Sequence, residues 1–390
     1  MTASTGDLVV DGLIGSISDG REPELQAEVE SSWQRAEDDL LLAADVHGVA
    51  PALARYTREH DVATAEARRL LEAARTRQLM RQLSITAEIA PAGNALTESG
   101  IDWVVLKGPA VASTLWPSPE MREYHDLDLL IRPDRFSDAI DVLQSAGYRL
   151  LDQNWPLISR QFRGELSFLS PRGVVLDVHW SAVNLAALRS RLRWSMNGLL
   201  ARRRTVAMGS VSAPTLDPVD TLLHLAYHAA HSGAHRLLWL KDVQLATHAV
   251  HDQGSTILER AQSARLELIL SVVLDRVSAL FRDDTVSAVA ESLPRSPWRR
   301  LVRRRDIATG PLRPFATGGT HRGLFMSTRT TGTTSVIASL GEARVKLQRG
   351  RRSDNAVTPE RNPLHEVVHD DDARANFLQR VGRSENFRVR

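Results

Sequence analysis

The spacing of apolar residues changes twice along this 390-residue chain, and these two changes restrict the possible folds more than any other feature. Over residues 23–100, apolar side chains recur every three or four positions, which predicts three or four packed helices. Between residues 103 and 180 the apolar runs are short, rich in β-branched residues and bounded by turn signals, which predicts strands. Helical spacing returns from residue 183 to about residue 305. The sequence therefore predicts an α/β unit between two helical regions.

The predicted α/β unit contains four strand segments. The first, at residues 102–107, leads into a helix, and the second, at residues 126–132, is followed by an amphipathic helix. The other two, at residues 165–170 and 173–180, flank a Pro-Arg-Gly turn and predict a hairpin. We assign the fold class as α/β (α+β), with a small mixed sheet flanked by N-terminal and C-terminal helical regions.

Four parts follow from this organisation. We expect an N-terminal helical region at residues 1–98, the α/β core at residues 99–182 and a helical acceptor or lid region at residues 183–305. The polar segment 306–390 is rich in glycine and arginine, and we expect an extension that is partly disordered. With 43% apolar residues, the chain can bury a substantial core.

Composition excludes several classes of site. The chain has no cysteine, so disulfides, thiolate zinc sites and a cysteine nucleophile are ruled out, and any metal must bind oxygen or imidazole ligands. Its 49 basic and 47 acidic residues nearly cancel to a net charge of +2, so no global field points to nucleic acid or a membrane. The N-terminus lacks the pattern of a signal peptide and no apolar run is long enough for a membrane helix, so we expect a cytoplasmic protein.

Two aspartates in the second strand segment share one face of the sheet. In Asp126-Leu127-Asp128 the two-residue repeat of a strand places both carboxylates on one side and Leu127 on the other. Adjacent anions repel, and a hard cation such as Mg²⁺ between them removes that repulsion. A third carboxylate, Asp177, stands in an otherwise apolar strand, so three carboxylates converge if the strands are adjacent. A solvated strand edge, and an aspartate paired with an arginine, stay open as structural interpretations.

Lys107 and Gly108 form the predicted phosphate-binding element. Glycine allows close approach of the backbone, the following helix presents free N–H groups, and the lysine adds a point charge. Arg122, four residues before Asp126, is a further candidate phosphate contact. A two-metal site beside a triphosphate serves phosphoryl transfer, because one ion lowers the pKa of the attacking hydroxyl and the other neutralises the leaving pyrophosphate. The alternative role for Lys107 is an ordinary cation at a helix start.

The motifs in this region resemble a known family. The stretch LKGPAVASTLW, followed by MREYHDLDLLI and LDVHW, resembles the uncharacterised nucleotidyltransferase family of the polymerase-beta-like superfamily. Its members carry L-K-G, then R-x-x-x-D-[IL]-D, then a later aspartate or histidine-tryptophan strand. The resemblance extends over roughly residues 45–250 and includes the segments that contain His47 and Asp242.

The resemblance implies roles for individual residues. Asp126 and Asp128 are implied to be metal ligands, and Asp177 is implied to be the third carboxylate and the general base. Lys107 and Gly108 stand where the broader superfamily has Gly-Ser, so the serine that binds phosphate is missing here. The implied cofactor is Mg²⁺, with two ions expected and Mn²⁺ as a substitute, and the implied donor is an NTP, with ATP as the default.

Further polar residues are weaker candidates. His179 lies on the same strand face as Asp177, where it touches substrate, orients a ligand or packs in the core. Asp242 stands in an apolar stretch, and a cap or an arginine pair competes with a site role. Four histidines share one predicted helical face, which either packs, lines the acceptor cleft or binds metal: His224, His228, His231 and His235.

Runs of arginine raise the question of nucleic-acid binding. They lie at residues 202–204 and 299–305, without interleaved aromatic residues or a recognisable nucleic-acid module. A solvated helical face or an interdomain contact is the favoured interpretation. Nucleic acid is therefore the less favoured partner, and no membrane partner is expected.

These features together predict a metal-dependent nucleotidyltransferase. It would move a nucleoside monophosphate from an NTP to an acceptor hydroxyl on a small molecule, a peptide or a protein. One alternative is a catalytically inactive NTP-binding or regulatory protein of the same fold, which the missing serine motivates. The other is an RNA-modifying, toxin-like nucleotidyltransferase, which the arginine runs motivate.

Overall fold

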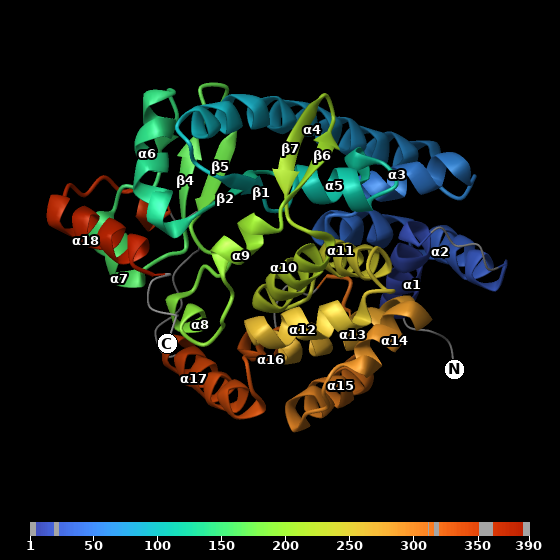
Figure 1. Ribbon diagram of the computed structural model, residues 1–390. Coiled ribbons are helices and arrows are strands. Elements are labelled where there is room, and N and C mark those ends of the chain that lie inside the picture. The colour runs from blue at the N-terminus through green and yellow to red at the C-terminus, as the bar shows by residue number, and fades with distance from the viewer. Residues whose placement is uncertain (1–4, 19–22, 311, 316–319, 351–361, 385–390) are drawn as a thin grey trace.

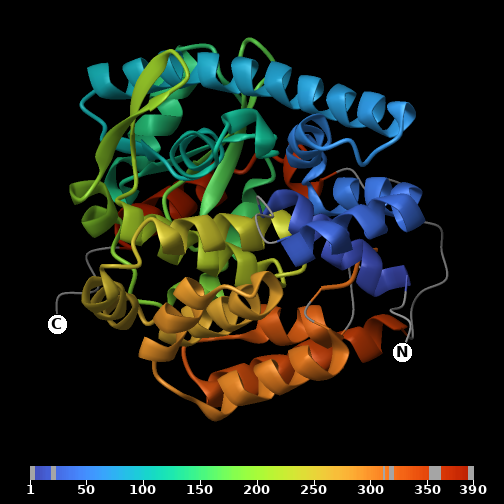
Figure 2. The ribbon, with the colours of Figure 1, turned by 90° about the vertical axis from the view of Figure 1, so that its right-hand side faces the viewer.

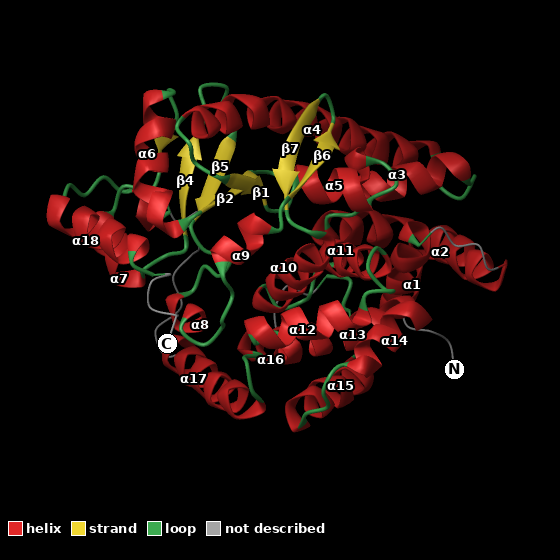
Figure 3. Cartoon of the chain, in the orientation of Figure 1, coloured by secondary structure: helices red, strands yellow, loops and turns green. Residues whose placement is uncertain are grey.

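A computed structural model of the chain describes residues 5–18, 23–310, 312–315, 320–350 and 362–384. All strands in this part of the chain belong to one sheet, which lies among helices on both faces and at both ends (Figures 1 and 3). No helix in the described ranges combines the length and the apolar character that crossing a membrane requires.

The N-terminal region is helical, as its apolar spacing predicts. The longest helix, α4, runs along one face of the sheet (Figure 1), and its N-cap Thr64 accepts a hydrogen bond from the backbone N–H of Ala67 at 3.2 Å. The helices are α1 (Thr5–Ile17), α2 (Pro23–His47), α3 (Ala50–Glu59) and α4 (Ala65–Glu98).

The sheet has seven strands in the order β3-β4-β5-β2-β1-β7-β6. It is mixed, because β2 pairs in parallel with β5 and β1 in parallel with β7, while the other pairs are antiparallel. This confirms the predicted fold class. The strands are β1 (Trp103–Val105), β2 (Leu127–Ile131), β3 (Arg149–Leu150), β4 (Glu165–Leu169), β5 (Val175–His179), β6 (Arg204–Met208) and β7 (Val211–Thr215). Between them lie α5 (Pro109–Leu115), η1 (Pro119–Met121), η2 (Pro133–Arg135), α6 (Phe136–Ser145), α7 (Trp155–Gln161), α8 (Ala186–Arg189) and α9 (Met196–Ala201).

The alternation of side chains along β2 divides the two faces of the sheet. Leu127 and Leu129 belong to the apolar core that also contains Ile85 and Ile89 of α4. Leu130 belongs to the second core, which contains the apolar residues of the helices after the sheet. Asp128 has the same parity as Leu130, so its carboxylate lies on the face away from α4.

The β6–β7 hairpin is a departure from the sequence prediction, which had continued helical spacing from residue 183 to about residue 305. It adds two strands to the sheet through the pairing of Val105 with Thr215. Its residues alternate between more and less exposed positions around Gly209, whose φ of +64° suits the turn. The arginines at residues 202–204 and the proline at residue 214 obscure this short alternating pattern in the sequence.

The helices after the sheet cover its other face. Figures 1 and 2 show α10 and α11 on the side of the sheet away from α4. As predicted, α10 begins at Pro218 with Asp217 as its N-cap, whose carboxylate accepts from the N–H of Val219 at 3.0 Å. The helices are α10 (Pro218–His231), α11 (Leu237–His248), α12 (Gly254–Ala264), α13 (Glu267–Phe281), α14 (Asp284–Ser292) and α15 (Pro297–Thr309).

The described part of the C-terminal extension contains helices. They are α16 (Thr320–Ser327), α17 (Gly332–Gly350), η3 (Pro363–His365) and α18 (Asp371–Gly382). The ring of Phe377 on α18 lies 6.1 Å from that of Trp155 on α7, so the chain returns to the edge of the core. Residues 311, 316–319, 351–361 and 385–390, on which part of the predicted disorder falls, lie outside the described residues.

The close approach of α4 to the sheet depends on Gly93. A Cβ atom at this position would lie 2.1 Å from the Trp103 ring of β1. We expect Gly93→Ala to lower the free energy of unfolding by about 1–3 kcal/mol, because the helix or the tryptophan must shift. Gly341→Ala is the control, since no atom lies within 4 Å of that Cβ position and alanine favours a helix. Equal urea midpoints for Gly93→Ala and the unsubstituted protein would contradict this prediction.

Candidate functional site

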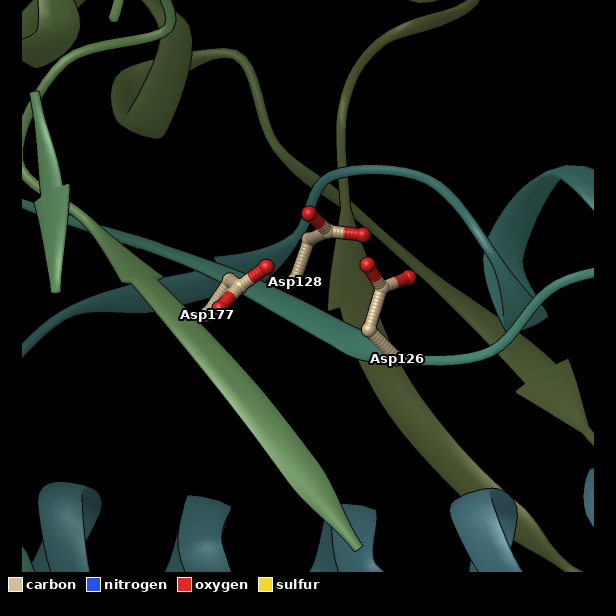
Figure 4. Close-up of side chains that lie close together, drawn as sticks. All are labelled: Asp126, Asp128 and Asp177. Atoms are coloured by element: carbon tan, nitrogen blue, oxygen red, sulfur yellow. The ribbon is translucent and has the colours of Figure 1, made fainter. Parts of the chain in front are cut away.

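Three carboxylates converge on the face of the sheet away from α4. Asp126 directly precedes β2, Asp128 lies within it, and Asp177 lies opposite Asp128 in the parallel β2–β5 register. One oxygen from each carboxylate lies within 4.8 Å of the corresponding oxygens of the other two. Figure 4 shows the three side chains turned toward one another from the two strands. The strand adjacency that the sequence could only assume is therefore present.

Lys107 lies against this cluster. Its Nζ atom is 2.5 Å from Oδ2 of Asp128 and 3.5 Å from Oδ1 of Asp126. Burial alone would lower the pKa of Lys107, but the charges of Asp128 and Asp126 outweigh it and raise that pKa. The lysine therefore stays protonated and acts as the counter-ion of the aspartate pair in this structure.

The three carboxylates differ in their affinity for protons. The charge of Asp128, reinforced by burial, raises the pKa of Asp126. Burial first, and then the charge of Asp128, raises the pKa of Asp177 to about 7. Burial would also raise the pKa of Asp128, but Lys107 and His179 hold it well below its ordinary value. One lysine thus balances the cluster incompletely, and oxygen donors in this electrostatic environment suit a hard divalent cation.

His179 bridges two carboxylates beside the cluster. Its Nε2 lies 3.1 Å from Oδ1 of Asp128, and its Nδ1 lies 3.2 Å from Oε2 of Glu165. Burial lowers the pKa of His179, but the hydrogen bond to Asp128 and the charge of Glu165 raise it above its ordinary value. His179 thus orients Asp128, which is one of the roles considered for it from the sequence.

Two residues of β4, which pairs with β5, contact the site and were not identified as site residues from the sequence. Ser167 lies opposite Asp177 and donates a hydrogen bond to its Oδ1 at 2.6 Å. Glu165 lies opposite His179 and also accepts a hydrogen bond from Asn184 at 2.6 Å. The sequence contains a pattern that would have identified them, because the predicted hairpin and the two-residue repeat place both side chains on the Asp177 face.

Gly108 makes the tight connection between β1 and α5. Its φ of +55° and ψ of −112° lie outside the region that residues with a Cβ atom commonly adopt. A Cβ atom there would also lie 3.3 Å from the backbone oxygen of Asp126. Glycine therefore lets the Lys107 segment run close beside the aspartate strand.

Arg122 is held in a buried ion pair. Its Nε and Nη2 atoms lie 2.9 Å from Oδ1 and 2.7 Å from Oδ2 of Asp242 on α11, and both side chains are almost fully buried. The indole of Trp116 donates to the same Oδ1 at 2.8 Å. Burial opposes the charge on Arg122, but Asp242 raises its pKa. This contact joins the core to the helical region, and the predicted phosphate contact of Arg122 stays a prediction.

The four histidines have different environments. His224 is buried, burial lowers its pKa to about 3, and neither of its ring nitrogens has a hydrogen-bond partner among the described residues. The ring of His228 lies 5.3 Å from that of Trp239, and His231 stacks on Tyr227 at 5.9 Å. The described residues contain one group of three or more potential metal ligands, and it is the aspartate cluster, not this helix face.

The arginine runs are partly used in ion pairs. Arg202 lies 2.7 Å from Asp220, Arg203 lies 2.8 Å from Asp102, and Arg299 lies 2.7 Å from Asp275. These pairs link separate elements of the chain. They support the interpretation of the runs as interdomain and surface contacts.

A mixed sheet that gathers three carboxylates beside a lysine-glycine turn is consistent with the nucleotidyltransferase class. The family described as "Uncharacterised nucleotidyltransferase" matches residues 34–282, and the chain belongs to this family. The resemblance inferred from the motifs is thereby confirmed, and the matched range contains every site residue described above. A comparison with curated proteins gave no match.

Proposed function

We propose that the protein transfers a nucleoside monophosphate from an NTP, with ATP as the default donor, to a hydroxyl of an acceptor. The acceptor classes are a small molecule, a peptide or a protein. The observation that carries this proposal is the convergence of Asp126, Asp128 and Asp177 within 4.8 Å, next to the Lys107-Gly108 turn.

The carboxylates would hold divalent metal, Mg²⁺ by preference, at this cluster. When bound, the metal would supply Lewis acidity toward the acceptor hydroxyl and neutralise charge on the triphosphate. The raised pKa of Asp177, about 7, suits a group that takes a proton from a hydroxyl near neutral pH, because donor and acceptor are then matched. Ser167 and His179 keep Asp177 and Asp128 in fixed orientations through hydrogen bonds.

Lys107 has two roles in this proposal. Without ligand its ammonium group contacts both Asp128 and Asp126 and balances part of their negative charge. When metal occupies the carboxylates, the long and flexible stem lets the ammonium group move to a phosphate oxygen of the donor. Its charge would then stabilise the leaving pyrophosphate, in place of the missing serine.

Transfer from an NTP labelled at the α-phosphate tests the proposal. We expect Mg²⁺-dependent label incorporation into the small-molecule or protein fraction of a cell extract, with release of pyrophosphate. Asp126→Asn and Asp128→Asn should abolish incorporation. Equal incorporation by these variants, or none from any of the four NTPs into any fraction, would contradict the proposal. Incorporation into RNA would instead support the RNA-modifying alternative.

One observation favours the inactive binding protein as a second candidate. The ammonium group of Lys107 lies 2.5 Å from Asp128 and so competes with a metal for the same carboxylate. A protein that never exchanges this lysine for metal would bind NTP without transfer. Calorimetric NTP binding that is independent of Mg²⁺, with no label transfer, would identify this case.

Metal binding should depend on pH. Because the pKa of Asp177 is raised to about 7, a proton occupies this carboxylate below that pH and competes with the metal. We therefore expect the affinity for Mn²⁺ to rise from about pH 6 to about pH 8, approaching tenfold per unit at the lower end. Electron paramagnetic resonance of free Mn²⁺ measures this affinity.

Two variants control the pH experiment. Asp177→Asn should weaken Mn²⁺ binding and flatten its pH dependence, because the competing proton is gone. Asp134→Asn, at an aspartate that is 47% exposed and paired with Arg132, should leave the profile unchanged. The same pH dependence in Asp177→Asn and the unsubstituted protein would count against this assignment.

A further inference from the structure

A pocket of about 140 Å³ lies beside the aspartate cluster, between the sheet and the helices after it. Lys107, Gly108 and Asp126 line it from the sheet side. From the helical side, it is lined by His228 of α10 and by Arg236 and Trp239 at the start of α11. It is smaller than the roughly 300–1,000 Å³ of pockets that hold whole drug-sized ligands, so it suits one part of a nucleotide.

The charges around this pocket are paired except at Arg236. Lys107 contacts Asp126 and Asp128, and Arg122 contacts Asp242. The lining carboxylate Glu123 contacts Arg81 and His125. Arg236, in contrast, has no carboxylate within ion-pair distance among the residues that the structure describes. An arginine fork beside a pocket and without a carboxylate partner is suited to bind an anion.

Two contacts hold the guanidinium of Arg236 in place. Its Nε donates to the backbone oxygen of Val46 at 3.0 Å, and its central carbon lies 5.7 Å from the centroid of the Trp239 ring. The ring of Trp239 is in turn flanked edge-on by His228, at 5.3 Å. The arginine is thus positioned by the backbone and by an aromatic ring, so little side-chain entropy would be lost on binding.

We propose that Arg236 binds the β- and γ-phosphates of the NTP donor and that the helical region thereby completes the phosphate site. The inference rests on the proposed function, because it assumes that an NTP is the donor. The positions of Asp177 and of the pocket relative to Asp128 support this assignment. Asp177 lies on β5, on one side of Asp128, whereas the pocket opens beside Lys107 and Gly108, which follow β1 on the other side. An acceptor activated at Asp177 and a pyrophosphate group leaving toward Lys107 would then lie on opposite sides of the transferred phosphate.

Calorimetric titration of Arg236→Gln with three probes tests this assignment: Mg·ATP, inorganic tripolyphosphate with Mg²⁺, and AMP. We expect the variant to bind Mg·ATP and tripolyphosphate about 10- to 100-fold more weakly, as expected for a lost charge-assisted hydrogen bond. AMP lacks the β- and γ-phosphates, so its affinity should change little. Unchanged affinity for both polyphosphates, or an equal loss for AMP, would overturn the assignment.

Control variants separate this inference from general effects of charge and folding. Arg300→Gln removes an exposed arginine of α15 and should leave all three affinities unchanged. Arg236→Lys keeps the charge without the fork and should show a smaller loss, so it replaces Arg236→Gln if that variant does not fold. An affinity for Mg·ATP equal to that of the unsubstituted protein in whichever variant folds would again reject the assignment.

These experiments distinguish failure of the Arg236 assignment from failure of the proposed function. If the unsubstituted protein binds tripolyphosphate through Arg236 but transfers no label from any NTP, the pocket assignment stands and nucleotidyl transfer is rejected. If label is transferred but Arg236→Gln retains full affinity, nucleotidyl transfer stands and the role of Arg236 is rejected. If the unsubstituted protein binds neither polyphosphate, both are rejected.

Discussion

Replacing Asp128 with asparagine is expected to abolish transfer and to destabilise the metal-free protein, whereas Asp126→Asn should abolish transfer without loss of stability. Both carboxylates belong to the proposed metal cluster, so each substitution should lower the transfer rate by at least about 100- to 1,000-fold, typical for a preorganised electrostatic group. Their effects on stability differ because the charges of the two aspartates are balanced differently.

The expected change in stability for each variant follows from the pKa of the aspartate that is replaced. Burial would raise the pKa of Asp128, but Lys107 and His179 hold it below its ordinary value, so the ionised form stabilises the fold at neutral pH. This stabilisation is lost as the pH falls through the folded pKa, and the neutral amide imitates that loss at any pH. Because the pair with Lys107 is buried, we expect a loss of about 3–5 kcal/mol in the free energy of unfolding.

The pKa of Asp126 is shifted in the opposite direction from that of Asp128. Its pKa is raised, first by the charge of Asp128, so ionisation disfavours the folded state at neutral pH. An uncharged amide removes that repulsion, and since the side chain is 31% exposed the gain should be at most about 1 kcal/mol.

Urea unfolding in the presence of a chelator, together with the label-transfer assay, checks both variants. Asp134→Asn serves as the control, because its exposed pair with Arg132 should contribute less than about 1 kcal/mol. Equal destabilisation by Asp126→Asn and Asp128→Asn would show that the cluster is a structural ion pair. Retained transfer in either variant would remove that aspartate from the catalytic site.

Most of the convergence of the carboxylates could be predicted, because all but one of its steps depend on short-range sequence patterns. The two-residue repeat places Asp126 and Asp128 on one face, and the turn at residues 171–173 places β4 beside β5. The parallel pairing of β2 with β5 follows from no short-range pattern, so the sequence leaves it as an assumption. In the structure the two strands do pair in parallel, and Asp128 lies directly opposite Asp177.

Partners that are distant in the sequence could not be predicted in the same way. Asp242 is 120 residues from Arg122, and no spacing rule connects an aspartate on a later helix to an arginine before β2. The sequence therefore suggested Arg122 as a phosphate contact from its proximity to Asp126 alone. No sequence pattern indicated a role for Arg236, because its proposed role depends on the pocket that α11 forms with the sheet.

Asp242→Ala is the second substitution with a large expected effect, and it tests the role of the buried pair. It would leave the guanidinium of Arg122 buried without a counter-charge and the indole of Trp116 without its acceptor. Removing one partner of a buried ion pair costs about 3–5 kcal/mol, so we expect the free energy of unfolding to fall by this amount. Asp102→Ala, in the partly exposed pair with Arg203, should cost less than about 1 kcal/mol.

The double variant Arg122→Met/Asp242→Leu separates a structural role from phosphate binding. Replacing both charges by apolar side chains removes the uncompensated charge, so most of the stability lost in Asp242→Ala should return. If Arg122 serves only to join the core to α11, the double variant should also bind Mg·ATP like the unsubstituted protein. Restored stability with a Mg·ATP affinity about tenfold lower would instead assign Arg122 to the phosphates, as the sequence suggested. Failure of the double substitution to restore stability would mean that the hydrogen bonds of Asp242, including that from Trp116, contribute more than its charge.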